Sequence, residues 1–192
     1  ELLEKIASEA FIPMAYGGGI HCLEDAKVIF EIGFEKIVIG TAAITNPELL
    51  EELTEHFGSQ SIVVSMDVKK NFFGKYKLMS FCGTKMSSYT IESFLENIRK
   101  SEVGELFLNA IDRDGSKKGY DLELIKKVSS ALDIPVISGS GAWSLNHLKE
   151  GLMYGASAVA AGSMFVYHGP HNAVMMNYPS RDVLEILFKE LV

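Results

Sequence analysis

Cysteine, proline and long apolar runs are scarce in this sequence. Its 192 residues include two Cys, five Pro and one Trp. Apolar runs such as Ala156 to Val166 are shorter than the roughly 20 residues that a membrane-spanning helix requires, so we expect no membrane partner. Cys22 and Cys82 lie far apart without the spacing of metal ligands, which predicts reduced thiols, no metal site and a cytoplasmic location.

Clusters of basic residues are also missing. The chain has 18 Lys and Arg against 25 Asp and Glu, a formal net charge of −7, and its cations form only short pairs such as Lys69-Lys70. Nucleic-acid affinity comes mostly from clustered Lys and Arg, so we expect no nucleic-acid partner. The hydrophobic content of 47% and the 17 Gly are instead typical of one compact globular unit.

Short β-branched runs alternate with longer amphipathic stretches along the chain. This alternation predicts repeated βα units around a parallel, fully buried sheet. We expect strands at residues 12–16, 36–40, 61–68, 105–111, 135–139 and 158–162, and helices at residues 23–31, 47–56, 91–100, 122–131, 145–154 and 183–191. The segment 70–88 interrupts the alternation, and its pattern around Gly74 predicts a hairpin-like excursion that decorates the active-site face.

An internal repeat is the strongest architectural signal. With a constant offset of 122 residues, Gly17, Gly19, Gly40 and Thr41 correspond to Gly139, Gly141, Gly162 and Ser163. That offset matches about four βα units, so the two halves predict an α/β fold of the (β/α)8, or TIM barrel, type. Since only six strands are visible, we expect residues 1–192 to form one partial barrel domain of about six of eight βα units, with the first two strands missing. An open α/β sheet is the alternative.

Glycine-rich loops with a nearby hydroxyl follow strands in both halves. In a (β/α)8 barrel the loops after the strands build the active site, and Gly-rich loops there often hold phosphate. Gly18, Gly19 and Thr41 therefore predict one anion site, and their repeat partners predict a second. Two such sites imply a substrate with a phosphate at each end. The alternative is that the glycines only permit tight turns.

Carboxylates at strand ends are the candidates for proton transfer. Asp67 ends a mostly apolar strand, where a carboxylate is costly unless it is paired or used, so we predict that it is catalytic. Asp112 and Asp114 follow the next strand and are weaker candidates. Asp112 can instead form a salt bridge with Arg113 or take part in a turn.

Five short motifs carry a resemblance to a known family. They are residues 16–20 (YGGGI), 41–43 (TAA), 57–60 (FGSQ), 67–69 (DVK) and 111–121 (IDRDGSKKGYD). Together they resemble the cyclase subunit of imidazole glycerol phosphate synthase, and the likeness covers nearly the whole chain. It implies a barrel that forms a heterodimer with a glutaminase subunit, takes ammonia from it, and condenses the ammonia with a bis-phosphorylated ribulosyl-formimino aminoimidazole carboxamide nucleotide in histidine biosynthesis. No cofactor is implied.

The resemblance also implies roles for individual residues. Asp67 matches one of two proton-transferring aspartates, and the other is expected in the missing first strand. Gly19 and Thr41 match one phosphate site of the family, and the residues that match the other are Asp114, Gly115, Gly141, Gly162 and Ser163. We also expect Gly18 and Asn109 to bind the substrate or its phosphates. Lys36 and Glu105 match charged residues around an ammonia entrance at the opposite face, which fits their places at the starts of strands. A plain surface salt bridge is the alternative for this pair.

Several residues depart from the usual cyclase pattern. They include Gly40, Asn109 and Trp143. Trp143 is expected either to stack on a substrate ring or to have a packing role. The stretch 167–180 is longer than the usual connection and is expected over the active-site mouth. That stretch, together with Asn109-Ala110 and residues 69–77, resembles a paralogous branch in which the barrel relays ammonia for acetamidino formation on a surface-polysaccharide sugar. A non-catalytic scaffold for the glutaminase is a third alternative.

Overall fold

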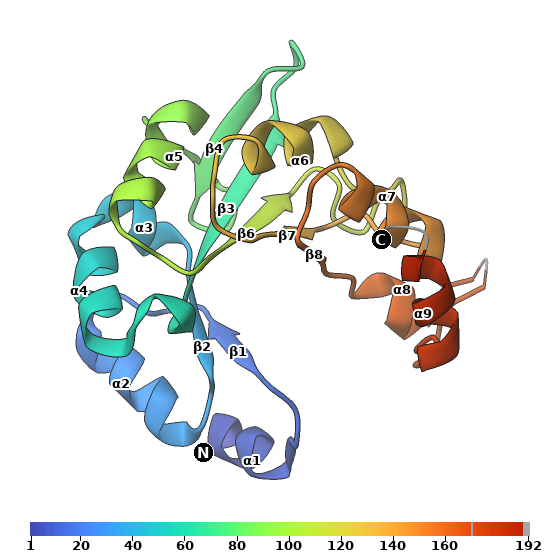
Figure 1. Ribbon diagram of the computed structural model, residues 1–192, viewed down its shortest axis with the longest axis horizontal. Coiled ribbons are helices and arrows are strands. Elements are labelled where there is room, and N and C mark those ends of the chain that lie inside the picture. Colours follow the sequence, from blue (N-terminus) through green and yellow to red (C-terminus); the bar gives the residue numbers. More distant parts are fainter. Residues whose placement is uncertain (170, 190–192) are drawn as a thin grey trace.

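A computed structural model describes residues 1–169 and 171–189 and shows a curved parallel sheet. Its strands lie in the order β1-β2-β3-β6-β7-β8, and every neighbouring pair is parallel. The bounds are β1 (Ala15–Gly17), β2 (Lys36–Ile39), β3 (Ile62–Lys70), β6 (Glu105–Ala110), β7 (Val136–Gly139) and β8 (Ala158–Val159). The sheet curls into an open half-barrel with helices on its convex side (Figure 1). All six predicted strands are present.

The helices alternate with the strands as predicted. They are α1 (Leu2–Glu9), α2 (Leu23–Ile32), α3 (Thr41–Thr45), α4 (Glu48–Phe57), α5 (Ile91–Lys100), α6 (Leu122–Ser129), α7 (Leu145–Met153), α8 (Ser163–Val166) and α9 (Arg181–Lys189), with a 3-10 turn η1 (Ser59–Ser61). The short helices α3 and α8 were not predicted. The last two residues of the helix expected at 183–191 lie outside the described residues.

Helix α5 shows why these segments are helical. Its buried residues recur at helical spacing, and they are Ile91, Phe94, Leu95 and Ile98. The Thr90 hydroxyl caps the amino end by accepting a hydrogen bond from the N–H of Ser93, while Arg99 and Lys100 lie in the last turn, where cations offset the helix dipole. Burial of the apolar side chains against the sheet supplies most of the stability of such a helix.

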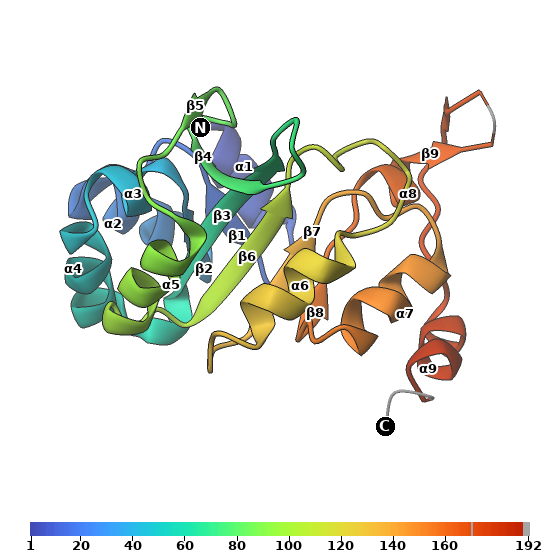
Figure 2. The ribbon, with the colours of Figure 1, turned by 90° about the horizontal axis from the view of Figure 1, so that it is seen from above.

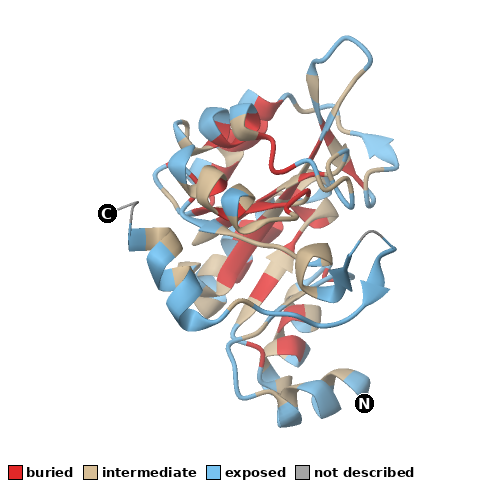
Figure 3. Cartoon of the chain, turned by 90° about the vertical axis from the view of Figure 1, so that its right-hand side faces the viewer, coloured by how far each residue is buried: buried red, intermediate tan, exposed pale blue. Residues whose placement is uncertain are grey.

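The two faces of the sheet differ in burial. Ile37, Val64 and Leu106 point toward the helices and are almost fully buried, whereas Val38 and Phe107, which alternate with them, are only half-buried on the concave face. Figure 3 shows the buried residues concentrated between sheet and helices. The prediction of a fully buried sheet is therefore wrong for the described chain, because only one face is covered by helices.

The internal repeat is visible in the backbone. Gly19 and Gly141 have left-handed φ angles of 73° and 96°, and Gly33 and Gly155 have φ angles of 109° and 105°. Each pair lies at corresponding points before and after helices α2 and α7. The two halves thus use the same glycine turns to connect a strand to its helix and that helix to the next strand.

Two hairpins extend from the barrel-like core. Strand β3 continues into β4 (Tyr76–Ser80) and β5 (Lys85–Met86), an antiparallel excursion that confirms the prediction for 70–88. A second, two-stranded hairpin of β9 (Tyr167–His168) and β10 (Ala173–Val174) lies in the long stretch after α8. It stands beside α8 at one side of the fold (Figure 2), and its turn residue Asn172 contacts Lys117. The stretch therefore borders one part of the expected mouth and does not lie over its middle.

Candidate active site

The loops that follow the parallel strands meet at one edge of the sheet, the upper edge in Figure 2. A first cavity of about 390 Å³ opens there between the loops after β1 and β2 and the end of β3. Its lining includes the predicted residues Gly18, Gly19, Thr41 and Asp67, together with Ser65, Phe81 and Cys82. The structure therefore brings the predicted first anion loop and the predicted carboxylate together.

A second, smaller cavity of about 140 Å³ lies at the same edge between the loops after β6, β7 and β8. Its lining includes the predicted residues Asp114, Gly115, Gly141, Gly162 and Ser163, together with Lys117 and Ser140. The two glycine turns related by the repeat therefore open on the same face of the molecule. This is the arrangement that two anions on one substrate would require.

Unpaired backbone donors line both cavities. Among the described residues, the N–H groups of Gly18 and Gly19 donate to no protein acceptor, and the same holds for Gly141 and Ser163. Gly18 and Gly19 are exposed, Ser163 is half-buried and Gly141 is buried. An N–H group without a protein acceptor can donate to an anion, and at the buried Gly141 an unpaired N–H is also costly. The lining of each cavity can thus supply N–H donors and a hydroxyl.

Asp67 is joined to the second cavity by a chain of hydrogen bonds. Its Oδ1 accepts from the Asn109 amide at 3.0 Å and from the Ser65 hydroxyl at 3.4 Å. The Asn109 oxygen in turn accepts from the hydroxyl of Ser140, which lines the second cavity. Within the described part of the chain, Oδ2 of Asp67 accepts no hydrogen bond, so this oxygen can receive a proton. Asn109 contacts the carboxylate rather than lining either cavity.

Thr41 is held with its hydroxyl proton available. The backbone N–H of Phe81 donates to Thr41 Oγ1 at 2.9 Å. A hydroxyl that already accepts one hydrogen bond still has its own proton to donate. Since Thr41 lines the first cavity, this proton can be offered to a bound anion.

Lys117 is a site residue that the sequence reasoning missed. Its ammonium lies 3.5 Å from the centroid of the Trp143 ring and donates to the side-chain oxygen of Asn172 in the second hairpin. Trp143 thus contacts a cation, a role distinct from both roles considered for it. Lys117 carries the only positive charge among the residues that line the second cavity. A lysine within the Asp-Gly-Ser-Lys segment was the available signal.

The other aspartate of this loop is not at a cavity. Asp112 is exposed, and no ion pair joins it to Arg113 among the described residues. The Arg113 guanidinium donates to the carbonyl of Lys118 at 3.4 Å, and the Arg113 N–H donates to the carbonyl of Ala110 at 2.8 Å. Of the two structural alternatives for Asp112, a turn or a salt bridge with Arg113, the described residues show the turn.

Lys36 and Glu105 meet at the opposite end of the sheet. They are the first residues of β2 and β6, and Lys36 Nζ lies 2.5 Å from Glu105 Oε1. Their side chains are 34% and 23% exposed, so the pair is partly shielded from water. Val38 and Phe107 follow them at every second position, on the concave face between this ion pair and the Asp67 end.

A buried carboxylate anchors the end of the second anion loop. Asp121 is 3% exposed, and it accepts from the Tyr76 hydroxyl at 2.8 Å and lies 2.9 Å from Lys70 Nζ. Burial alone would raise the pKa of Asp121, but hydrogen bonds from Lys70 and Tyr76 hold that pKa below its ordinary value. Burial likewise raises the pKa of Tyr120, so its hydroxyl stays protonated and donates to the carbonyl of Ala160 at 2.9 Å.

Among residues 1–169 and 171–189, no helix is long and apolar enough to cross a membrane. These residues also contain no group of three or more His, Cys, Asp and Glu side chains that could hold a metal ion.

Comparison with known proteins gives one family. A sequence model of the family described as "Histidine biosynthesis protein" matches residues 1–172. The chain is 42% identical over 189 residues to the "Putative imidazole glycerol phosphate synthase subunit HisF" of Leptospira borgpetersenii, covering 97% of this chain and 74% of that protein. It is 42% identical over 187 residues to the "Putative imidazole glycerol phosphate synthase subunit hisF2" of Pseudomonas aeruginosa, with the same coverage. It is 36% identical over 169 residues to the "Imidazole glycerol phosphate synthase subunit HisF" of Alkaliphilus metalliredigens, covering 88% of this chain and 67% of that protein.

Proposed function

Because the chain belongs to the histidine biosynthesis protein family, we propose that it is the cyclase subunit of an imidazole glycerol phosphate synthase. The observation that carries the proposal is the position of Asp67 beside one anion-type cavity, with a hydrogen-bonded link to a second. A substrate with two phosphates would bridge these cavities and pass over the carboxylate. The bis-phosphorylated ribulosyl-formimino aminoimidazole carboxamide nucleotide of this pathway has that form.

The substrate would be held mainly by its two ends. In the first cavity, the N–H groups of Gly18 and Gly19 and the Thr41 hydroxyl would donate to one phosphate. In the second, the N–H groups of Gly141 and Ser163 would donate to the other, with Lys117 supplying charge. Holding both ends fixes the reacting carbons over Asp67, and such positioning supplies much of the rate enhancement of an enzyme.

Asp67 would act as a general base toward the incoming ammonia. When ammonia nitrogen bonds to an electrophilic carbon of the substrate, the nitrogen becomes positively charged and must lose a proton. Oδ2 of Asp67 would accept that proton, while the Asn109 amide keeps Oδ1 in place at 3.0 Å. Proton transfer by a positioned group typically contributes about 10²–10⁴ in rate.

Ammonia would enter at the Lys36–Glu105 end of the sheet. Only unprotonated ammonia has the lone pair that attacks carbon, so its path must exclude water. Val38 and Phe107 would form the apolar part of the path between the ion pair and Asp67. We therefore propose that a glutaminase subunit binds at this end, forms a heterodimer with the chain and releases ammonia through the ion pair, which acts as its gate.

Residues 1–192 are proposed to be one partial (β/α)8 domain that two further βα units would complete. Apolar side chains exposed near each end of the sheet support this view. Phe11 and Ile12 precede β1, and Ile186 lies in α9, which follows β8 in the chain. The first of the two added strands would carry the second proton-transferring carboxylate. Free, exposed Cys22 and Cys82 fit a reducing compartment, the cytoplasm.

A second candidate function is ammonia relay for amidation of a surface-polysaccharide sugar. It is favoured by the contacts of Lys117. The Lys117 ammonium lies over the Trp143 ring and donates to Asn172, so it joins the second anion loop to the long stretch 167–180. These contacts hold Lys117, the one cation among the described residues that line the second cavity, against residues of the long stretch and of the loop after β7. Under this alternative the chain would pass ammonia on to a separate sugar amidotransferase.

The two functions are separated by supplying substrate and ammonia directly. The chain, joined to the part of the Leptospira borgpetersenii relative that it does not match, is mixed with the bis-phosphorylated nucleotide and ammonium salt at high pH. Imidazole glycerol phosphate is expected, and Asp67→Asn should abolish it while phosphate binding persists. Absence of product from a folded, phosphate-binding protein would reject the cyclase function. Stimulation of a glutaminase without product would favour a non-catalytic scaffold.

A further inference from the structure

The excursion formed by β3, β4 and β5 contacts the loops of both cavities. At the turn between β4 and β5, the N–H of Phe81 donates to the hydroxyl of Thr41 in the first anion loop. Beside the projecting turn between β3 and β4, the Tyr76 hydroxyl donates to Asp121 Oδ1 at 2.8 Å, and Lys70 Nζ lies 2.9 Å from Asp121 Oδ2. One continuous segment therefore holds a residue of each loop.

Asp121 fixes the end of the second anion loop through several polar contacts. The carboxylate also caps α6 by accepting from the N–H of Leu124 at 3.2 Å, so it ties the hairpin and the helix start together. Tyr120 beside it donates to Ala160, and the N–H of Gly119 donates to the carbonyl of Gly141 at 2.9 Å. A displacement of Asp121 would therefore move the backbone on both sides of the second cavity.

The turn between β4 and β5 packs closely between the two loops. Phe81, Cys82 and Gly83 are three consecutive left-handed residues, with φ angles of 50°, 54° and 78°. A Cβ on Gly83 would lie 2.5 Å from Cδ1 of Ile111, the residue that begins the second anion loop. Non-glycine residues rarely adopt a left-handed backbone unless the surrounding structure imposes it. We infer that the packing against Ile111 and the hydrogen bond to Thr41 hold Phe81 and Cys82 in this conformation.

We propose that Lys70, Tyr76 and Asp121 are positioning residues, through which the hairpin sets the geometry of the second anion site while Phe81 sets that of the first. The hairpin would thereby fix the separation of the two bound phosphates. This inference rests on the two anion sites of the proposed function. It adds that residues outside both cavities determine how well those sites bind.

The single Trp of the chain provides the assay. An anion in the second cavity would draw Lys117 away from the Trp143 ring, and the loss of this 3.5 Å contact would change the indole fluorescence. Inorganic phosphate is titrated into the wild-type chain and into Tyr76→Phe, which removes only the hydroxyl donated to Asp121. The Kd for phosphate should rise about tenfold in the variant. Lys70→Met should raise it by a similar factor.

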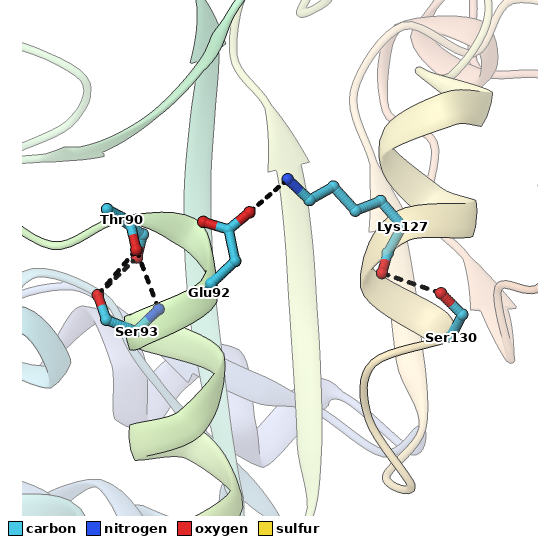
Figure 4. A network of polar contacts seen from close by, with 5 residues as sticks. All are labelled: Thr90, Glu92, Ser93, Lys127 and Ser130. Carbon is cyan, nitrogen blue, oxygen red and sulfur yellow. Dashed lines mark hydrogen bonds and ion pairs between the residues drawn. The ribbon is translucent and has the colours of Figure 1, made fainter.

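Glu92→Gln is the matched control. Glu92 in the first turn of α5 lies 2.6 Å from Lys127 on α6, so it also holds that helix, but away from the anion loop (Figure 4). Its substitution should leave the Kd for phosphate unchanged even where the melting temperature falls. If Tyr76→Phe and Lys70→Met melt at lower temperature but bind phosphate as the wild type does, the positioning role is overturned. If the wild-type chain itself binds no phosphate, the proposed function fails first and the positioning role fails with it.

Discussion

Replacing Asp121 tests a polar network built on a buried carboxylate. Asp121→Ala removes three interactions at once, since the carboxylate caps α6 through Leu124 and pairs with Tyr76 and Lys70. Loss of a helix cap costs about 1 kcal/mol. A Tyr76 hydroxyl left without its acceptor costs about 1 kcal/mol. The partly exposed ion pair with Lys70 adds about 1 kcal/mol.

The expected total is a fall of about 3 kcal/mol in the free energy of unfolding, which corresponds to a melting temperature lower by roughly 6–12 °C for a chain of this size. Asp121→Asn retains an oxygen that can accept from Leu124 and Tyr76 and loses only the charge. It should therefore cost about 1 kcal/mol. Urea denaturation followed by circular dichroism measures both values.

The pH dependence follows from the direction of the pKa shift. The pKa of Asp121 is lower in the folded chain than in the unfolded chain, so the folded state binds fewer protons. The stabilisation is complete above the unfolded pKa of about 4 and is lost as the pH falls through the lower folded pKa. In Asp121→Asn, stability should fall less steeply over this acidic range than in the wild type.

Equal losses of unfolding free energy in Asp121→Ala and Asp121→Asn would refute this reasoning. They would mean that the charge supplies the whole effect and that the cap and the Tyr76 bond supply none. A loss below about 1 kcal/mol for Asp121→Ala would contradict the buried network itself. Glu92→Gln breaks an exposed ion pair with Lys127 of α6, the helix that Asp121 caps. It should lower the free energy of unfolding by about 0.5 kcal/mol or less, which gives the size of an exposed ion pair for comparison.

Three other perturbations address the active site. Asp67→Asn in the completed barrel should lower the rate of product formation from ammonium by about 10²–10⁴; an unchanged rate would remove Asp67 from the chemistry. Lys36→Met or Glu105→Gln should impair the reaction with glutamine and the glutaminase more than the reaction with ammonium salt, and equal effects on both would argue against a gate. In Cys22→Ser, phosphate should slow the reaction of Cys82 with a thiol reagent, because Cys82 lines the first cavity; unchanged reactivity at saturating phosphate would argue against an anion there.

Local pattern was enough to predict most of the secondary structure. The spacing of apolar residues in α5 and the β-branched run of β3 each describe a single element, whose period depends only on backbone geometry. The repeat located Gly19 and Gly141 at the same kind of turn, because a left-handed backbone at these points favours glycine. Burial was harder to predict, since it depends on what covers each face of the sheet.

Part of the candidate site was also predictable. Parallel strands carry all their carboxyl ends to one edge, so residues at or just after those ends, such as Asp67, Thr41 and Ser163, had to lie at the same edge. For the same reason Lys36 and Glu105, which begin strands, had to lie at the other edge. The roles assigned to these residues remain predictions.

The sequence by itself determined the order of strands and helices, the duplicated glycine turns and the edge at which each polar strand end lies, because these follow from short-range periodicity and parallel pairing. Only the tertiary structure decided the contacts of Lys117 with Trp143, of Phe81 with Thr41 and of Tyr76 with Asp121. Each joins residues on different loops. Their meeting depends on the curvature of the sheet and the path of each loop, which no local pattern specifies.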